Sequence, residues 1–299
     1  MLNIEPKGKR FGPYEVLHLM GTSGQSAVFA AKHETTQHKV VLRVMTMAVT
    51  NLDAAIVECT QVLEEISNID APNIVKIEDY GIHNALIYIA MTIMEGGSLS
   101  DRMKSRMESA LGDDAQLPSA GEVLQMLERV AIALDDIHER DMVHGQIGPG
   151  SIMFDKKGTA FVSDIGLTRL MKIIFRLEAT NSFNMNPYSA PELWNGERPS
   201  PATDQYALAC VIYELLTGKP PFNNTSIYHL MQAHMDDVAA PPHYIRPDLP
   251  SELALVFWQA LAKPVDRRFP SVLAFHKGLQ DALGDKLGEE TDFFTFALL

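Results

Sequence analysis

Hydrophobic and polar residues follow two different patterns along the chain. Between residues 11 and 94, apolar runs of strand length are separated by glycine, serine and other polar residues, which predicts β-strands. The runs YEVLHLM and AVFAAKH flank the turn GTSGQS and predict a hairpin, and KVVLRVM, IVKIEDYG and ALIYIAMTIM predict further strands. One stretch with helical spacing, residues 54–69, interrupts these strands.

Helical spacing of apolar residues dominates after residue 95. Ser119 and Glu122 form the S-x-x-E pattern of a capping box, and the apolar residues that follow predict a helix as far as about His138. Further helices are predicted at residues 204–217, 227–236, 252–262 and 271–283, whereas the polar stretch 104–118 predicts a surface loop. The sequence therefore predicts an α+β protein in which a β-rich part precedes a longer helical part.

The composition narrows the possible partners. The 299 residues carry a formal charge of −13, which argues against nucleic-acid binding because non-specific binding needs a basic surface. Cys59 and Cys210 lie in apolar helical patterns and are expected to be buried, reduced thiols. No apolar run reaches the roughly 18 residues of a membrane span, and the first residues do not form a signal peptide. We therefore expect a cytoplasmic protein.

A series of short motifs runs through the chain in a recognisable order. After the glycine-turn hairpin come VVLRVM, PNIVKIEDYG, MEGGSL, IHERDMVHG, VSDIGLTRL, YSAPELW, TDQYALACVIYELLTGKPPF and RRFPS. This order resembles that of a protein kinase domain, in particular the bacterial serine/threonine protein kinases of eukaryotic type. The resemblance implies a two-lobed α+β fold with a β-rich N-lobe carrying one long helix (11–94) and a mainly helical C-lobe (95–285), between tails at 1–10 and 286–299.

The resemblance also implies a nucleotide site, in which this chain has several altered residues. Gly21 matches the first glycine of the phosphate-binding loop, but Ser23 and Ser26 replace the next two glycines and restrict the backbone. Arg43 stands in place of the phosphate-positioning lysine, and a guanidinium is not equivalent to a compact ammonium group. ATP is therefore expected to bind weakly or not at all. The residues implied for its pocket are Gly21, Val28, Val41, Arg43, Met91, Ile93, Met94 and Met153.

The segment VHGQIGPGSIMF, residues 143–154, matches the family's catalytic loop but contains no charged residue. Gln146 replaces the aspartate that accepts the proton of the substrate hydroxyl, and an amide cannot act as a base near neutral pH. Gly148 replaces the lysine that neutralises the transferring phosphoryl group, and Ser151 replaces an asparagine that binds metal. Losing a positioned base lowers a rate by typically about 10²–10⁴.

Asp164 keeps the residue type that binds Mg²⁺ in the family. One carboxylate with a serine hydroxyl is a sparse ligand set for this ion, so the alternative is that Asp164 caps its own loop. Mg²⁺ is therefore expected to bind weakly, if at all.

Several structural positions of the family are also kept. Glu192 and Arg268 match a glutamate and an arginine that pair with each other, and Asp204 matches the acid that holds the catalytic loop. Val62 stands where the family has the glutamate that pairs with the lysine. Because Glu58 and Glu65 lie about one helical turn to either side of Val62, either could form a shifted ion pair with Arg43.

The substituted chemistry residues and the kept scaffold together predict a pseudokinase, a kinase-like domain that binds a protein partner or regulates it with little or no phosphotransfer. Two alternatives stay open: a weak or unconventional ATP-dependent serine/threonine kinase using Mg²⁺ on Asp164, and a nucleotide-sensing switch that binds ATP without turnover. Thr180 and Ser182 are candidate phosphorylation sites. The apolar C-terminal sequence TDFFTFALL is expected either to dock on its own domain or to contact a partner.

Overall fold

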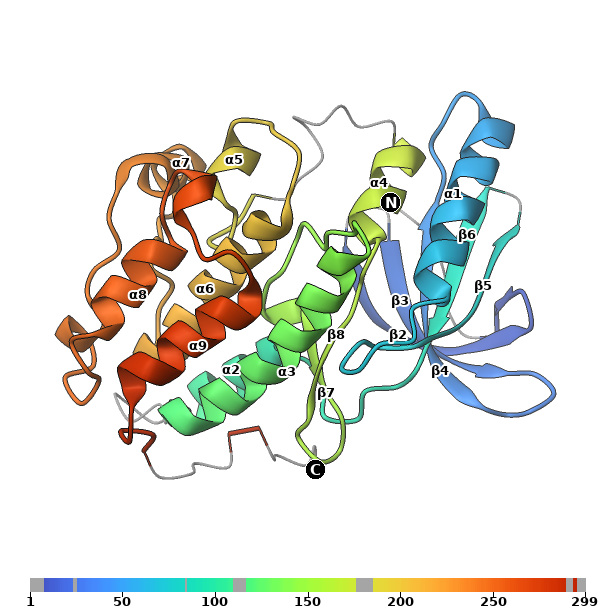
Figure 1. Cartoon of the computed structure of the whole chain (residues 1–299). Coiled ribbons are helices and arrows are strands. Elements are labelled where there is room, and N and C mark those ends of the chain that lie inside the picture. The colour runs from blue at the N-terminus through green and yellow to red at the C-terminus, as the bar shows by residue number, and fades with distance from the viewer. Residues whose placement is uncertain are drawn as a thin grey trace. The chain divides into compact units, whose positions relative to one another are not determined.

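The computed structural model of the chain describes residues 8–23, 26–83, 85–109, 117–175, 185–288 and 293–294 (Figure 1). Its internal contacts divide the chain into two compact units. The sheet unit comprises Met1–Asp70, Val75–Ile93 and Gly166–Glu178, and the helical unit comprises Ala71–Ile74, Met94–Ile165 and Ala179–Leu299. The predicted α+β class is confirmed, whereas the predicted domain boundaries stay a prediction.

An antiparallel sheet of six strands forms the centre of the sheet unit. In the order in which they pair, the strands are β1 (Arg10–Phe11), β2 (Tyr14–Ser23), β3 (Ser26–His33), β4 (Lys39–Thr46), β6 (Leu86–Met91) and β5 (Ile77–His83). The predicted hairpin is the pair β2–β3. Alternate residues of the middle strands fill an apolar core, which includes Val16, Phe29, Val40, Leu42 and Val44.

Two helices belong to the sheet unit. The helix α1 (Leu52–Ser67) is the predicted one, and Asn51 caps it by accepting a hydrogen bond from the Ala54 amide at 3.2 Å. The helix α4 (Leu167–Phe175) was not predicted. It packs against α1, where Arg169 forms an ion pair with Glu65 at 2.5 Å.

The helical unit contains the remaining elements, and each helix predicted there from apolar spacing is present. Its main helices are α2 (Leu99–Ser109), α3 (Ala120–Glu139), α5 (Pro191–Trp194), α6 (Pro201–Thr217), α7 (Ile227–Asp236), α8 (Leu253–Ala260) and α9 (Val272–Leu283). The strands β7 (Ile152–Phe154) and β8 (Ala160–Val162) form a short ladder, and the single turns η1 (Pro149–Ser151), η3 (Pro242–Tyr244) and η4 (Val265–Arg267) complete the unit.

The helices α3 and α6 form the core of the helical unit, and they contact each other. The predicted capping box begins α3, because Ser119 accepts a hydrogen bond from the Glu122 amide and the Glu122 carboxylate accepts one from the Ser119 amide. The helix α6 is buried along nearly its whole length and ends at Gly218, whose φ of 83° suits glycine. A helix buried on all sides needs no polar face, which explains its almost continuous apolar sequence.

One predicted loop was wrong in part. The stretch 104–118 was expected to be a surface loop, but α2 continues as far as Ser109. A local cap starts this polar helix, since the Asp101 carboxylate accepts hydrogen bonds from both the amide and the hydroxyl group of Ser98. The pattern S-x-x-D before the helix was the signal that could have revealed it.

Burial agrees with the expected roles of several residues. Cys59 and Cys210 are buried free thiols, as predicted, and burial raises the pKa of Cys59 to about 11.

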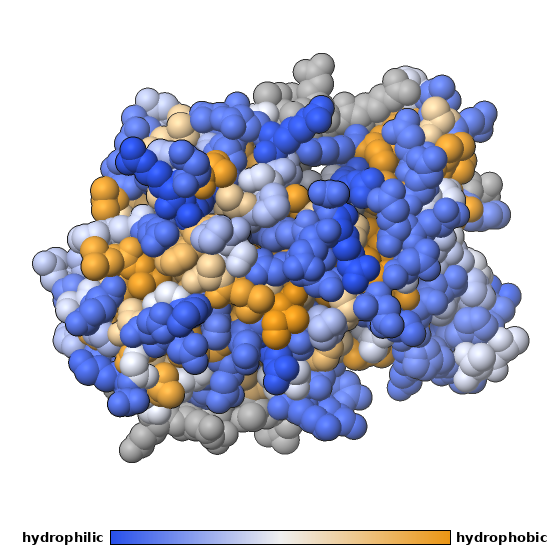
Figure 2. All heavy atoms as spheres, viewed as in Figure 1, coloured by the Kyte–Doolittle hydropathy of each residue, from blue (hydrophilic) through white to orange (hydrophobic). Residues whose placement is uncertain are grey.

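Apolar side chains also reach the surface of the helical unit over α8, where Leu255 is 68% exposed (Figure 2). Within the described part of the chain, no helix is both long and apolar enough to cross a membrane.

Candidate active site

One buried carboxylate group, that of Asp204, holds the loop 143–151 of the helical unit in place. Asp204, at the start of α6, is completely buried and accepts hydrogen bonds from the amides of His144 (2.9 Å) and Gly145 (2.7 Å). Gly145 has a φ of 78°, a left-handed conformation that glycine adopts without strain. The prediction that Asp204 holds this loop is confirmed.

His138 supplies the counter-charge to Asp204. Its Nε2 lies 2.9 Å from an Asp204 oxygen, and its Nδ1 lies 3.7 Å from Asp135. Burial disfavours the charged form, but the hydrogen bonds with Asp135 and Asp204 outweigh burial and raise the pKa of His138 to about 9. His138 is therefore protonated at neutral pH and places a positive charge beside the completely buried Asp204 side chain. No motif in the sequence predicted this role for His138.

His144 connects the loop with the end of β8. Its Nδ1 accepts a hydrogen bond from the Gln146 amide at 3.3 Å, so the ring proton lies on Nε2, which donates to the Ser163 carbonyl at 2.9 Å. The next residue along the chain is Asp164. The loop and the segment that carries Asp164 are thus fixed to each other within one unit.

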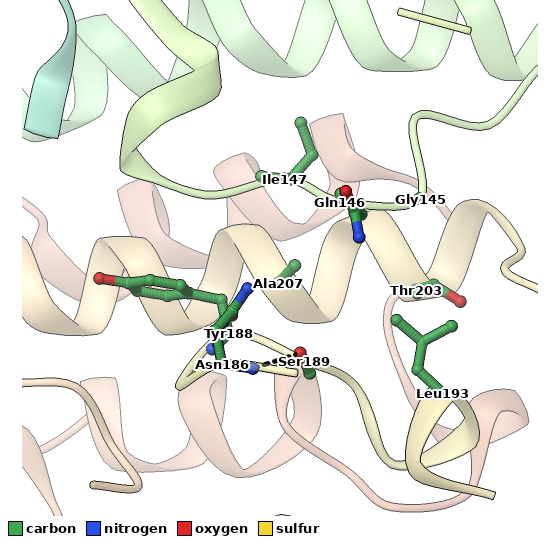
Figure 3. A pocket seen from close by; sticks show the side chains of 9 residues that line it. All are labelled: Gly145, Gln146, Ile147, Asn186, Tyr188, Ser189, Leu193, Thr203 and Ala207. Carbon is green, nitrogen blue, oxygen red and sulfur yellow. Dashed lines mark hydrogen bonds between the residues drawn. The ribbon is translucent and has the colours of Figure 1, made fainter. Parts of the chain in front are cut away.

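Gln146 is exposed and lies at the edge of a small pocket (Figure 3). The pocket has about 10 Å³ of interior space, enough for about one water molecule. Its remaining lining residues are Gly145, Ile147, Asn186, Tyr188, Ser189, Leu193, Thr203 and Ala207. Gln146 extends from its loop toward α6 and the turn at residues 186–189, which a hydrogen bond from the Asn186 amide to Ser189 closes at 3.0 Å. The side chain that replaces the catalytic base therefore lies at a small depression lined by both apolar and polar residues.

Tyr188 fixes this pocket to α6. Its hydroxyl donates a hydrogen bond of 2.6 Å to Glu214, and burial raises the pKa of that carboxyl group above its usual value. A Cβ atom at Gly148 would lie 3.6 Å from the Tyr188 ring, which is an ordinary contact, and the backbone of Gly148 is extended. Glycine at position 148 is therefore not required by the backbone. The loss of the lysine is a loss of charge and does not follow from a change in loop shape.

Ser151 uses its hydroxyl group within the loop. It donates to the Gly148 carbonyl at 3.0 Å and accepts from the Gly148 amide at 3.2 Å. The ladder β7–β8 continues to a hydrogen bond from the Ser163 amide to the Ser151 carbonyl, so Asp164 follows directly after the residue opposite Ser151. Asp164 is half-buried with a φ of 64°. Of the two predicted oxygen ligands for Mg²⁺, Ser151 thus uses its hydroxyl group in hydrogen bonds to Gly148.

No preformed metal cluster stands in for the missing ligands. Among the residues that the structure describes, no group of three or more His, Cys, Asp and Glu side chains is placed to hold an ion. Mg²⁺, however, often takes only one or two protein carboxylates and completes its shell with water and substrate phosphates. Asp164 therefore fits a substrate-completed Mg²⁺ site, and its role stays a prediction.

The pair of Glu192 and Arg268 is present as predicted. The guanidinium donates two hydrogen bonds to the carboxylate, at 2.9 and 2.7 Å, and Thr203 donates a third at 2.7 Å. Burial favours the neutral acid, but the bonds from Arg268 prevail and lower the pKa of Glu192. This pair holds α5, and with it one wall of the Gln146 pocket, against the segment before α9.

The residues implied for the nucleotide pocket divide between the two units. In the sheet unit, the register aligns Gly21, Val28 and Arg43 across β2, β3 and β4, and it pairs Val41 with Met91 across β4 and β6. Val28, Val41 and Arg43 are half-buried and alternate with the core residues, so they share the other face of the sheet. Ile93 is 36% exposed.

The other two implied pocket residues belong to the helical unit. The Met94 carbonyl accepts a hydrogen bond from the Gly97 amide at 3.1 Å, and Met153 lies on β7, bridged to Ser98. The contact of any of these residues with a nucleotide stays a prediction.

The expected ion pair of Arg43 with a shifted glutamate stays a prediction. Arg43 donates a hydrogen bond to the hydroxyl group of Ser26 at 3.3 Å, and Glu65 pairs with Arg169. Val62 is buried on α1 with 3% exposure, so its apolar side chain belongs to the helix packing. The unpredicted helix α4 supplies the arginine that pairs with Glu65. The candidate phosphorylation sites Thr180 and Ser182 lie outside the described residues.

Comparison with known families gives one match that covers most of the chain. The family described as "Protein kinase domain" matches residues 14–269. The serine/threonine-protein kinase PknD of Mycobacterium tuberculosis is 30% identical over 278 residues, which are 92% of this chain and 40% of PknD. The serine/threonine-protein kinase PrkC of Bacillus subtilis is 25% identical over 285 residues, 95% of this chain and 43% of PrkC.

Solved structures show the same fold. The crystal structure of the M. tuberculosis PknI kinase domain has a TM-score of 0.71 and 25% identity, and the match covers 93% of this chain and 98% of that one. The two-lobed fold expected from the motif order is thus confirmed. The chain spans about 40% of the length of the curated relatives that it matches.

These relatives contradict the prediction of a pseudokinase with little or no phosphotransfer. They are named as serine/threonine-protein kinases, and the comparisons favour the alternative of an unconventional kinase. The prediction gave too much weight to the substituted residues Arg43, Gln146, Gly148 and Ser151. Phosphoryl transfer depends largely on positioning, and the positioning contacts of the loop are intact.

Proposed function

Because the chain belongs to the protein kinase family, we propose that it is an ATP-dependent serine/threonine protein kinase domain that transfers phosphate slowly and by unconventional means. The observation that carries this proposal is the loop 143–151, which Asp204 holds in place with Gln146 facing a pocket. The names of the relatives support the reaction class. The acceptor is a hydroxyl group of a protein partner, and the domain works in the cytoplasm.

In this proposal Gln146 positions the acceptor without acting as a base. Its amide oxygen accepts a hydrogen bond from the substrate hydroxyl and directs the hydroxyl oxygen toward the γ-phosphate. A glutamine orients the attacking water in GTPases in the same manner. Because the transition state of phosphoryl transfer is loose, the proton can leave late, onto an oxygen of the transferred phosphoryl group, and the cost of lacking a base is about 10²–10⁴ in rate.

ATP and Mg²⁺ complete the proposed site. Asp164 of the helical unit is the residue that would bind the ion. In the sheet unit, the residues that would contact the nucleotide are Gly21, Val28, Val41, Arg43, Met91 and Ile93. Bound Mg²⁺ neutralises the charge that develops on the phosphate oxygens. Arg43 would keep a positive charge at the position of the family's lysine, whereas the charge at position 148 is lost.

A nucleotide-sensing switch is the second candidate. The observation that favours it is the pair of hydrogen bonds between the Ser151 hydroxyl group and the backbone of Gly148. These bonds occupy the hydroxyl group that stands in place of the family's metal-binding asparagine. Such a domain would bind ATP through the remaining residues without transferring phosphate. Its signal would be the increase in the stability of the folded state when ATP is bound.

Phosphate transfer from labelled ATP tests the kinase proposal. The purified chain is incubated with Mg²⁺ and γ-labelled ATP, with and without a generic protein substrate, and labelled serine and threonine are measured. We expect slow incorporation that Asp164→Ala abolishes, whereas Asp285→Ala, the same change at an exposed site, leaves it unchanged. Gln146→Asp should raise the rate, but by less than about 10², because Gly148 still lacks the lysine.

A thermal-shift titration with ATP separates the two candidates. Ligand at about 100 times its Kd stabilises a folded protein by about 2.7 kcal/mol. Stabilisation by ATP and Mg²⁺ without phosphate transfer would favour the switch over the kinase. A chain that shows neither stabilisation nor transfer would refute both.

A further inference from the structure

Two phenylalanines near the C-terminus are buried on the helical unit. Phe293 is 3% exposed and Phe294 is 7% exposed. Both polar groups of the Phe293 backbone are bonded to charged side chains: the amide donates to Glu122 at 2.9 Å, and the carbonyl accepts from Arg102 at 3.3 Å. The segment is therefore held through its main chain as well as through its rings.

The ring of Phe294 extends this contact. It stacks on Phe154 of β7, with ring centroids 5.2 Å apart and planes inclined by 15°. The Arg102 guanidinium lies 4.2 Å from the centroid of the same Phe154 ring. An aromatic ring, a cation and a carboxylate thus converge on one dipeptide, and each contributes a different kind of interaction.

The charged residues of this surface are themselves buried, with exposures of 6% for Arg102 and 8% for Glu122. Buried charges must be compensated by hydrogen bonds. Glu122 accepts from the amides of Ser119 and Phe293, and Arg102 donates to the carbonyls of Gly96 and Phe293. Each charge thus has one backbone partner in its own region and one in the C-terminal segment.

The same surface holds the residues that follow Met94. The Gly96 amide donates to the Phe154 carbonyl and the Phe154 amide donates to the Gly97 carbonyl, both at 2.9 Å. Arg102 Nε donates to the Gly96 carbonyl at 3.1 Å. Phe154 and Arg102 therefore contact the C-terminal segment and residues 96–97 at the same time.

We propose that Arg102, Glu122 and Phe154 form a peptide-binding site for a segment with two adjacent phenylalanines, occupied in this chain by its own residues 293 and 294. Docking of this segment orders residues 96–97. The C-terminus thereby regulates the part of the helical unit next to Met94. The geometry of the docked segment does not depend on the proposed kinase activity, and neither does the test.

Peptide binding in trans tests the site. The full-length variant Phe293→Ala/Phe294→Ala opens the site, and a fluorescent peptide of residues 289–296, EETDFFTF, is titrated against it by anisotropy. We expect saturable binding to this variant and binding at least about tenfold weaker to the wild-type chain, whose own segment competes at high effective concentration. Leu287→Ala, an apolar truncation in the same region outside the site, should behave like the wild type.

The identity of the occupant is tested by the same titration. A peptide in which both phenylalanines are alanines should not bind. Equal binding to the wild type and the variant, or no binding to the variant, would overturn the proposal. A wild-type dimer that dissociates in the variant would show that the occupant comes from a second copy, which also overturns it.

Amide hydrogen exchange tests the effect on residues 96–97. We expect the amides of Gly96, Gly97 and Phe154 to exchange at least about tenfold faster in the double variant, and a saturating amount of the peptide to restore slow exchange. The amides of His144 and Gly145, held by Asp204, should be unaffected, which separates local opening from general destabilisation.

The conservative variant Phe294→Leu keeps an apolar side chain and should give an intermediate increase in exchange, so the proposal stays testable if the double variant does not fold. Unchanged exchange at Gly96 and Gly97 in a folded variant would refute the regulatory part.

Discussion

Replacing His138 with glutamine removes a buried positive charge while keeping an N–H donor within reach of Asp204. In the wild type, His138 lies 2.9 Å from Asp204 and 3.7 Å from Asp135, and only 9% of its side chain is exposed. Its pKa is raised from 6.5 to about 9. At about 1.36 kcal/mol for each tenfold change in proton affinity, this corresponds to about 3 kcal/mol of folding free energy.

The sign of the effect fixes its pH dependence. A histidine whose pKa is higher in the folded state contributes its full stabilisation below the unfolded pKa and loses it as the pH rises through the folded value. The wild type should therefore exceed His138→Gln in the free energy of unfolding by about 3 kcal/mol at pH 6. This difference should fall steeply between about pH 7 and 9, and little should be left at pH 10.

Urea denaturation followed by circular dichroism at pH 6, 7.5, 9 and 10 measures this difference. His229→Gln is the matched control, because His229 is exposed on α7 and the chemical change is the same. The control should stay close to the wild type at each pH. A difference between His138→Gln and the wild type that stays constant from pH 6 to pH 10 would refute the charge argument and leave only a packing effect.

Three further predictions concern packing and burial. Arg268→Met leaves Glu192 buried without its bidentate partner, so the free energy of unfolding measured in urea should fall by about 3–5 kcal/mol. Adding Glu192→Gln should recover part of this loss. A double variant whose loss equals the sum of the two single losses would contradict this reasoning. Gly218→Ala puts a side chain at a φ of 83° and should cost about 1 kcal/mol in the same assay, whereas Gly150→Ala, which meets no atom within 4 Å, should cost less. Because burial raises the pKa of Cys59 to about 11, the two thiols should react with a disulfide reagent at pH 8 only as fast as the chain unfolds; rapid labelling of the folded protein would refute their burial.

The success of the sequence in predicting the fold depended on how each helix is buried. Helices with one apolar face, such as α3 and α9, show their periodicity directly, and the Ser119–Glu122 pattern fixed the start of α3. By contrast, α2 is polar over most of its length, so its sequence resembles that of a loop. The helix α4 owes its position to contacts with α1, which no local pattern reveals.

The sequence predicted those site residues whose contacts are the same as the contacts that the family resemblance implies. Asp204 and the pair Glu192–Arg268 could be identified from the order of motifs because each makes the same contacts that the resemblance implies. His138 was missed, although a histidine at the end of an apolar helix face, six residues before His144, was a usable signal. The pairing of Glu65 depends on the position of α4 and could not be derived from spacing along the chain.

The backbone of Gly148 is extended, so the geometry of the loop does not require a glycine at this position. Since neither the dihedral angles nor the neighbouring Tyr188 ring excludes a side chain at this position, a cation can be introduced without rebuilding the turn. Cysteine at position 148, alkylated to a lysine analogue, would supply the missing charge in a folded protein and in graded amounts. Each charge of a phosphotransfer site can thus be introduced into this loop one at a time. Its contribution to the rate of phosphate transfer can be measured while the loop backbone stays the same.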